Sequence, residues 1–61
     1  MMIGARDLTQ YYLEGQKRGK SFAELRDKLT LISTYQGAYG NWYEYRDDKG
    51  NYWEEYVSLG D

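Results

Sequence analysis

The chain has 61 residues and a formal net charge of −2, with eight Tyr and two Trp but neither Cys nor His. A chain of this length makes one domain, which buries only about 60% of the surface it exposes when unfolded. Without Cys or His, the usual zinc and haem ligands and the usual acid/base group at neutral pH are missing. An oxygen-only metal site is the remaining alternative, but an acidic turn in contact with solvent is favoured over it. The sequence therefore predicts a single non-enzymatic domain, residues 1–61, with no catalytic residue, no metal site and no cofactor.

The chain contains no apolar run of the length that a signal peptide or a membrane span needs. A lack of Cys is typical of proteins in reducing compartments. We therefore expect a soluble, cytoplasmic protein that does not contact a membrane. Its charge is uneven, since residues 1–30 carry six basic and four acidic groups and residues 31–61 carry two and six.

The first predicted element is a helix over about 8–18. Asp7 is a residue type that caps free amides at a helix start. Lys17 and Arg18 lie where cations favour a helix C-terminus, and Gly19 suits the position just beyond it.

A second helix is predicted after Ser21, which forms a capping box with Glu24. Phe22, Leu25 and Leu29 follow at the spacing of one helical face. The pattern allows this helix to continue to about residue 36, but residues 30–35 are rich in β-branched side chains. We therefore expect a short helix followed by a strand near 30–36, which would also support a hairpin that is weak alone.

Strands near 41–47 and 51–58 are predicted on the two sides of Asp48-Lys49-Gly50. This turn fits either a two-residue loop or a type I turn with a Gly bulge. The expected fold class is therefore α+β: two short N-terminal helices packed on a small antiparallel sheet of two or three strands, ending in an aromatic β-hairpin.

The two-residue loop would place Arg46 opposite Trp53 and Trp42 opposite Val57. Both Trp residues would then cover the helices together with Val57 and Leu59. The opposite, exposed face would hold four tyrosines: Tyr43, Tyr45, Tyr52 and Tyr56. A shift of one residue would mix these groups, because side chains alternate with a period of two.

The favoured function is binding of a protein with a basic or groove-like surface, as an adaptor or inhibitor, with a homodimer as the nearest variant. Tyr and Trp are enriched at binding hot spots, and carboxylates would steer a basic partner. The alternative is that the rings only stabilise the sheet as cross-strand pairs. The predicted partner-binding residues are Trp42, Tyr43, Tyr45, Tyr52, Glu54 and Tyr56.

A second functional hypothesis is nucleic-acid binding through the basic segment between the two helices. Two helices joined by a Gly-containing turn resemble a helix-turn-helix in outline only. The acidic C-terminal half argues against a broad nucleic-acid surface, so this hypothesis stays second. Its candidate residues are Lys17, Arg18, Lys20 and Arg26.

Overall fold

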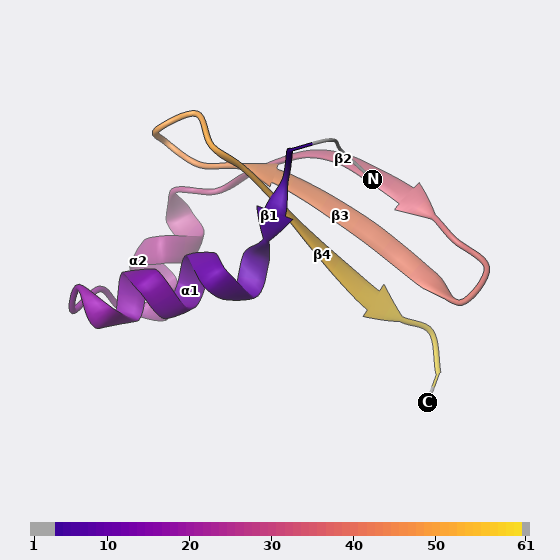
Figure 1. Cartoon of the computed structure of the whole chain (residues 1–61), viewed down its shortest axis with the longest axis horizontal. Helices are drawn as coiled ribbons and strands as arrows, with labels where there is room; N and C mark the ends of the chain where they lie inside the picture. Colours follow the sequence, from indigo (N-terminus) through magenta and orange to yellow (C-terminus); the bar gives the residue numbers. More distant parts are fainter. Residues whose placement is uncertain (1–3, 61) are drawn as a thin grey trace.

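The computed structural model describes residues 4–60, which form two helices and one four-stranded mixed sheet. The elements are β1 (Arg6–Asp7), α1 (Leu8–Lys17), α2 (Phe22–Asp27), β2 (Thr30–Gln36), β3 (Gly40–Arg46) and β4 (Tyr52–Ser58). The strand order is β1-β4-β3-β2, with β1 parallel to β4 and the other pairs antiparallel (Figure 1). The α+β class is confirmed, but the sheet has four strands, is not purely antiparallel, and begins before the helices.

The additional strand, β1, is only two residues long. Arg6 lies opposite Trp53 and Asp7 lies opposite Glu54. Two residues cannot show the alternation by which a strand is recognised in a sequence. The pairing of β1 is therefore a product of tertiary contact with β4.

The predicted helix starts are confirmed by their capping contacts, and α1 ends at Lys17, one residue before the predicted end. Oδ1 of Asp7 accepts a 3.0 Å hydrogen bond from the amide of Thr9, and Oγ of Ser21 accepts a 3.2 Å bond from the amide of Glu24. Gly19 adopts a φ of +82° just after α1, a conformation that side-chain-bearing residues rarely take. It lets the chain turn at once from α1 into α2.

The structure also decides between the helix and the strand after residue 28. The second helix ends at Asp27, and β2 begins at Thr30. The strand near 30–36 is confirmed, and the continuous helix to residue 36 is wrong. A bulge between Leu31 and Ser33 shifts the register of β2 against β3.

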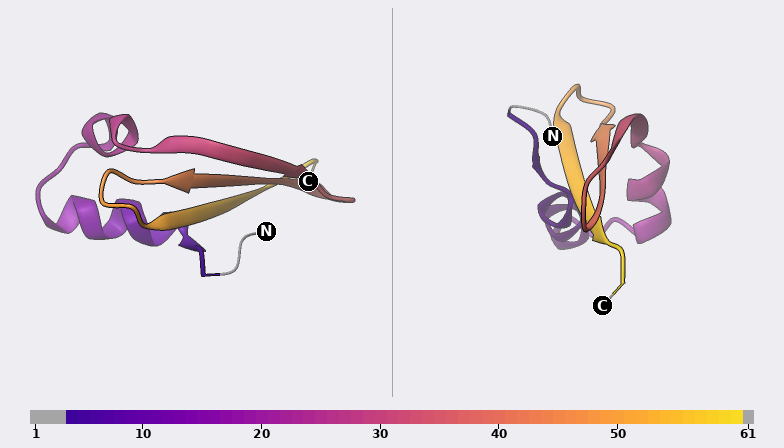
Figure 2. Two further views of the ribbon diagram at one scale, coloured as in Figure 1. Left: turned by 90° about the horizontal axis from the view of Figure 1, so that it is seen from above. Right: turned by 90° about the vertical axis from the view of Figure 1, so that its right-hand side faces the viewer.

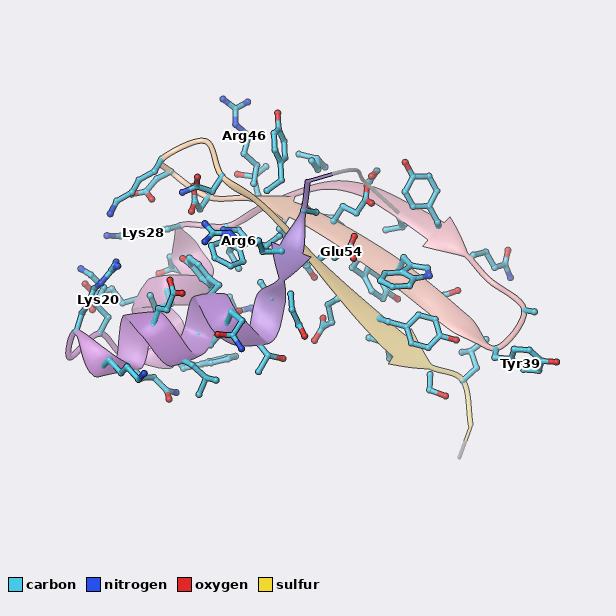
Figure 3. The ribbon with its side chains drawn as sticks, viewed as in Figure 1. Arg6, Lys20, Lys28, Tyr39, Arg46 and Glu54 are labelled. Atoms are coloured by element: carbon cyan, nitrogen blue, oxygen red, sulfur yellow. The ribbon has the colours of Figure 1, made fainter. Side chains whose placement is uncertain are left out.

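Both helices lie at the end of the sheet where β3 turns into β4, while the β2–β3 hairpin extends beyond them (Figures 1 and 2). Within residues 4–60, the buried apolar side chains are Leu8, Leu25 and Trp53, all at the helical end. Gly15 lets the helices approach, because a Cβ there would overlap the side chain of Leu25. At the far tip, Tyr39 projects into solvent with 81% of its surface exposed (Figure 3).

The β3–β4 turn is the type I turn with a Gly bulge, so the two-residue loop used for the face assignment is wrong. Arg46 lies opposite Tyr52, not Trp53. The amide of Gly50 donates to the carbonyl of Asp47 at 3.2 Å, and Gly50 has a φ of +87°. The third loop residue moves the whole register by one position.

This register redistributes the aromatic side chains. Residues directly opposite each other in an antiparallel pair share a face. The first face, called here the helix face because Trp53 and Tyr45 lie near the helices, also holds Tyr43 and Glu55. The other, called the outer face, holds Trp42, Glu44, Arg46, Tyr52, Glu54 and Tyr56. The two Trp residues therefore lie on opposite faces, and the four tyrosines are divided two and two.

Candidate functional site

A row of three aromatic residues crosses the outer face. Tyr35, Trp42 and Tyr56 are consecutive neighbours on β2, β3 and β4. The ring centroids of Trp42 and Tyr56 lie 5.0 Å apart at an interplanar angle of 52°. Tyr35 and Tyr56 keep 46% and 43% of their surface exposed. The row therefore offers ring faces and edges to solvent.

A row of carboxylates lies next to the aromatic row. Asp7, Glu54 and Glu44 are consecutive neighbours on β1, β4 and β3. Glu44 is fully buried, and its Oε1 accepts a 2.7 Å hydrogen bond from Oγ of Ser33. Like charges directly opposite each other destabilise a sheet. The outer face thus concentrates negative charge beside exposed rings.

The two rows border an open pocket of about 370 Å³ at the edge of β4, where the chain turns from β1 into α1. We call it the aromatic–acidic pocket; it is lined by Asp7, Thr9, Trp42, Glu54, Glu55 and Tyr56. None of these lining residues is basic. Figure 3 shows Glu54 beside β1 near the middle of the sheet.

One buried carboxylate oxygen distinguishes this pocket. Within residues 4–60, Oε1 of Glu54 is buried and has no hydrogen-bond partner. Asp7 differs, because its Oδ1 is already used by the amide of Thr9. A buried acceptor left unsatisfied costs about 1–3 kcal/mol, and more when it is charged. A cationic group entering from outside would remove that cost.

The chemistry of the pocket suits an organic cation. Trp and Tyr rings attract ammonium and guanidinium groups through their π faces, and carboxylates bind the same groups by charge-assisted hydrogen bonds. The part of the chain that the structure describes has no cluster of three or more acidic, His or Cys side chains arranged for a metal ion. Lysine and arginine side chains carry these ammonium and guanidinium groups.

The structure brings together three of the six predicted partner-binding residues: Trp42, Glu54 and Tyr56 line the aromatic–acidic pocket. The other three lie elsewhere. Tyr43 and Tyr45 are on the helix face, and Tyr52 lies on the outer face beside the β3–β4 turn.

Sequence reasoning missed Asp7, Thr9 and Glu55 as pocket residues. Asp7 was recognised only as a helix cap. Nothing in its local sequence indicates that β1 would pair with β4, some 47 positions later in the chain. Glu55 alternates onto the opposite face from Glu54, yet lines the pocket because the sheet edge is open beyond β1.

A second pocket, of about 260 Å³, lies between the helices and the β3–β4 turn. We call it the basic pocket because five of its lining residues are cations: Arg6, Arg18, Lys20, Lys28 and Lys49. Of the four predicted nucleic-acid residues, Arg18 and Lys20 line this pocket. Lys17 is exposed at the end of α1, and Arg26 lies beside Tyr12 and Phe22 at another hollow.

Asp47 lines the basic pocket and accepts four hydrogen bonds there. Its Oδ1 accepts the amides of Lys49 and Asn51 at 2.9 and 2.8 Å. Its Oδ2 accepts Nδ2 of Asn51 at 3.2 Å and Nε1 of Trp53 at 3.0 Å. Burial alone would raise the pKa of Asp47, but these bonds favour the ionised form and lower the pKa below its ordinary value.

Three tyrosines near the helices have their pKa raised, and burial is the first cause in each. For Tyr11, the negative charges of Asp47 and Asp48 raise it further. The hydroxyl of Tyr11 donates a 2.6 Å hydrogen bond to the carbonyl of Leu25, which joins α1 to α2. All three hydroxyls therefore stay protonated at neutral pH, and that of Tyr11 also links the two helices.

Comparisons of the chain with protein-family models, curated proteins and solved structures find no match. Neither helix in the described residues combines the length and the apolar character needed to cross a membrane.

Proposed function

We propose that this chain is a small non-catalytic protein-binding module that acts as an adaptor or inhibitor of a larger protein. The aromatic–acidic pocket receives a lysine or arginine side chain of the partner. The single observation that carries the proposal is the buried Oε1 of Glu54, which has no hydrogen-bond partner among residues 4–60 and lies beside the rings of Trp42 and Tyr56. The proposal also places the partner in the cytoplasm, and the lack of Cys in this chain is the support for that location.

The exposed rings provide apolar surface that a partner can cover. Tyr35 and Tyr56 are each more than two-fifths exposed, so a partner would bury new apolar area on contact. Aromatic anchors lose little side-chain entropy on binding and dominate many interfaces. A desolvated cation–π contact adds about 2 kcal/mol or more. The carboxylates then select a basic side chain over a neutral one.

A foreign partner fits this surface better than a second copy of the chain. A two-fold interface would bring Asp7, Glu54 and Glu55 of the two copies face to face. Like-charge juxtaposition across an interface costs several kcal/mol. The homodimer is therefore the less favoured variant, and sedimentation of the protein alone would reveal it.

The test is selection of binding peptides from a random displayed library on the intact protein. We expect the enriched peptides to carry Lys or Arg next to an apolar residue. Glu54→Gln keeps the shape of the side chain and removes its charge, so the selected peptides should bind about tenfold more weakly. Tyr56→Leu keeps an apolar side chain but removes the π face, and should also weaken binding.

Asp27→Asn is the matched control, since Asp27 is an exposed carboxylate at the end of α2, away from the pocket. It should leave peptide binding unchanged. Failure to enrich any basic peptide would contradict the proposal. So would enriched peptides that bind the Glu54→Gln variant as tightly as the original chain.

A further inference from the structure

The basic pocket gathers cations from parts of the chain that are distant in sequence. Arg6 comes from β1, Arg18 and Lys20 from the connection between the helices, Lys28 from the end of α2 and Lys49 from the β3–β4 turn. Figure 3 shows Arg6, Lys20 and Lys28 directed toward the helical end of the molecule. Three carboxylates share the lining: Glu14, Asp47 and Asp48.

The carboxylates neutralise this positive charge only in part, since the lining holds five cations and three carboxylates. Asp48 lies 4.0 Å from Lys28, and the exposed Glu24 lies 3.5 Å from Lys20. Asp47 already accepts four hydrogen bonds from its own loop and from Trp53. Among residues 4–60, this leaves three of the five cations without an ion pair: Arg6, Arg18 and Lys49.

Arg6 is held in place over the pocket. Its guanidinium lies 4.4 Å from the centroid of the Trp53 ring, and its backbone pairs with Trp53 across β1 and β4. Stacking on an aromatic ring restricts the side chain but leaves the in-plane N–H donors free. A guanidinium of this kind is pre-organised to bind a planar or tetrahedral oxyanion.

A helix-stabilising role accounts for only part of this cluster. Cations near the end of α1 interact favourably with its C-terminal carbonyls, which explains Lys17 and Arg18. Lys17, however, does not line the pocket, whereas Arg6 and Lys49 line it from outside both helices. The convergence of these cations therefore needs a different explanation.

We propose that the basic pocket binds a phosphate group. Its volume of about 260 Å³ lies just below the range of about 300–1,000 Å³ that holds a whole drug-sized ligand. The phosphate enters while the remainder of the ligand stays outside. Trp53 is only 3% exposed and Arg6 covers its ring, so the pocket offers no free surface for stacking a base. Phosphate groups occur both in free pyrophosphate and in the backbone of a nucleic acid.

The two indole N–H groups provide a built-in comparison for the experiment. Trp53 lines the basic pocket, and Trp42 lines the aromatic–acidic pocket. The ¹⁵N-labelled protein is titrated with sodium pyrophosphate and, separately, with a thymidine oligonucleotide, against sodium sulfate at equal ionic strength. We expect a saturable shift of the Trp53 indole resonance that weakens with salt, and no shift of the Trp42 resonance.

The variants Arg18→Gln and Lys49→Gln should each weaken binding about tenfold, because each removes one charge-assisted contact. Both residues are exposed, and the spectra themselves show whether each variant is folded. Arg46→Gln and Arg26→Gln are the matched controls, since neither residue lines the basic pocket. In Figure 3, Arg46 points away from it.

The titrations and the variants either support or overturn phosphate binding in the basic pocket. Pyrophosphate binding without oligonucleotide binding assigns the pocket to free phosphates; tighter oligonucleotide binding with a steeper salt dependence assigns it to a nucleic-acid backbone. No shift of Trp53 at millimolar pyrophosphate or oligonucleotide overturns the proposal. Equal weakening by Arg46→Gln overturns it as well, because binding would then follow overall charge. None of these results depends on the aromatic–acidic pocket.

Discussion

Nε1 of Trp53 donates a 3.0 Å hydrogen bond to Oδ2 of Asp47, and this bond ties the β3–β4 turn to the buried end of the sheet. It requires both side chains to lie on the same face. In the observed register they do, because Asp47 and Asn51 close a three-residue loop. In a two-residue loop, Asp47 would lie on the face opposite Trp53, so this bond selects the longer turn.

Replacement of Asp47 by Asn should destabilise the fold by about 1.5–3 kcal/mol. The amide can still accept the two backbone N–H groups at one oxygen, but its NH₂ group would face the donors Nδ2 of Asn51 and Nε1 of Trp53. Urea unfolding at neutral pH, followed by Trp fluorescence, measures the change. Asp48→Asn is the control, because Asp48 is exposed and should cost well under 1 kcal/mol. Equal loss in both variants would contradict the special role of Asp47.

Acid should unfold the protein partly through Asp47. Its folded pKa is lowered below the ordinary 3.8, so the unfolded chain binds its proton first as the pH falls. Its contribution to stability is present in full above the unfolded pKa and is lost as the pH falls through the folded pKa. The stability difference between the original chain and Asp47→Asn should therefore shrink below about pH 4. A difference that stays constant down to pH 2 would contradict this assignment.

Alkaline conditions should weaken the contact between α1 and α2. The pKa of Tyr11 is raised above 10.0 in the folded state, chiefly by burial, so its contribution is complete below pH 10. It is lost as the pH rises through the folded pKa, when the hydroxyl can no longer donate to Leu25. Tyr11→Phe should cost about 0.5–1.5 kcal/mol at neutral pH and flatten the alkaline decline. Thermal unfolding at pH 7 and above pH 10 measures both effects, and an unchanged decline in the variant would rule out Tyr11 as its source.

Replacement of Gly15 by Ala should destabilise the domain although Ala is the better helix former. The gain in helix propensity is about 1 kcal/mol. Against it stands the overlap of the new Cβ with Leu25, and overpacking of this kind costs about 1–3 kcal/mol. Urea unfolding of Gly15→Ala beside Gln16→Ala separates the two effects, since Gln16 is exposed. A stabilised Gly15→Ala variant would mean that Leu25 repacks without cost.

Much of the local structure followed from short-range chemistry. Asp7 and Ser21 marked the helix starts, Gly19 marked the break between the helices, and the β-branched run marked β2. These features depend on residues within four positions of each other, so the sequence contains their physical causes. The same holds for the presence of a turn at Asp48-Lys49-Gly50, although not for its length.

The candidate pockets depended on contacts that no local pattern contains. Parallel pairing of β1 with β4 brought Asp7 beside Glu54 and Arg6 onto Trp53. The shift of one residue in the β3–β4 register moved Trp42 to the outer face, where its ring meets Tyr56.

Local sequence patterns by themselves indicated a small α+β domain, and the composition showed that it is rich in aromatics and has neither Cys nor His. Only the tertiary structure decided which rings and charges share a surface. The physical reason is that successive side chains of a strand point to opposite faces. One additional residue in the loop therefore changes which side chains of β3 and β4 lie on the same face. That residue is fixed by the hydrogen bond between Asp47 and Trp53, two side chains that meet only in the folded chain.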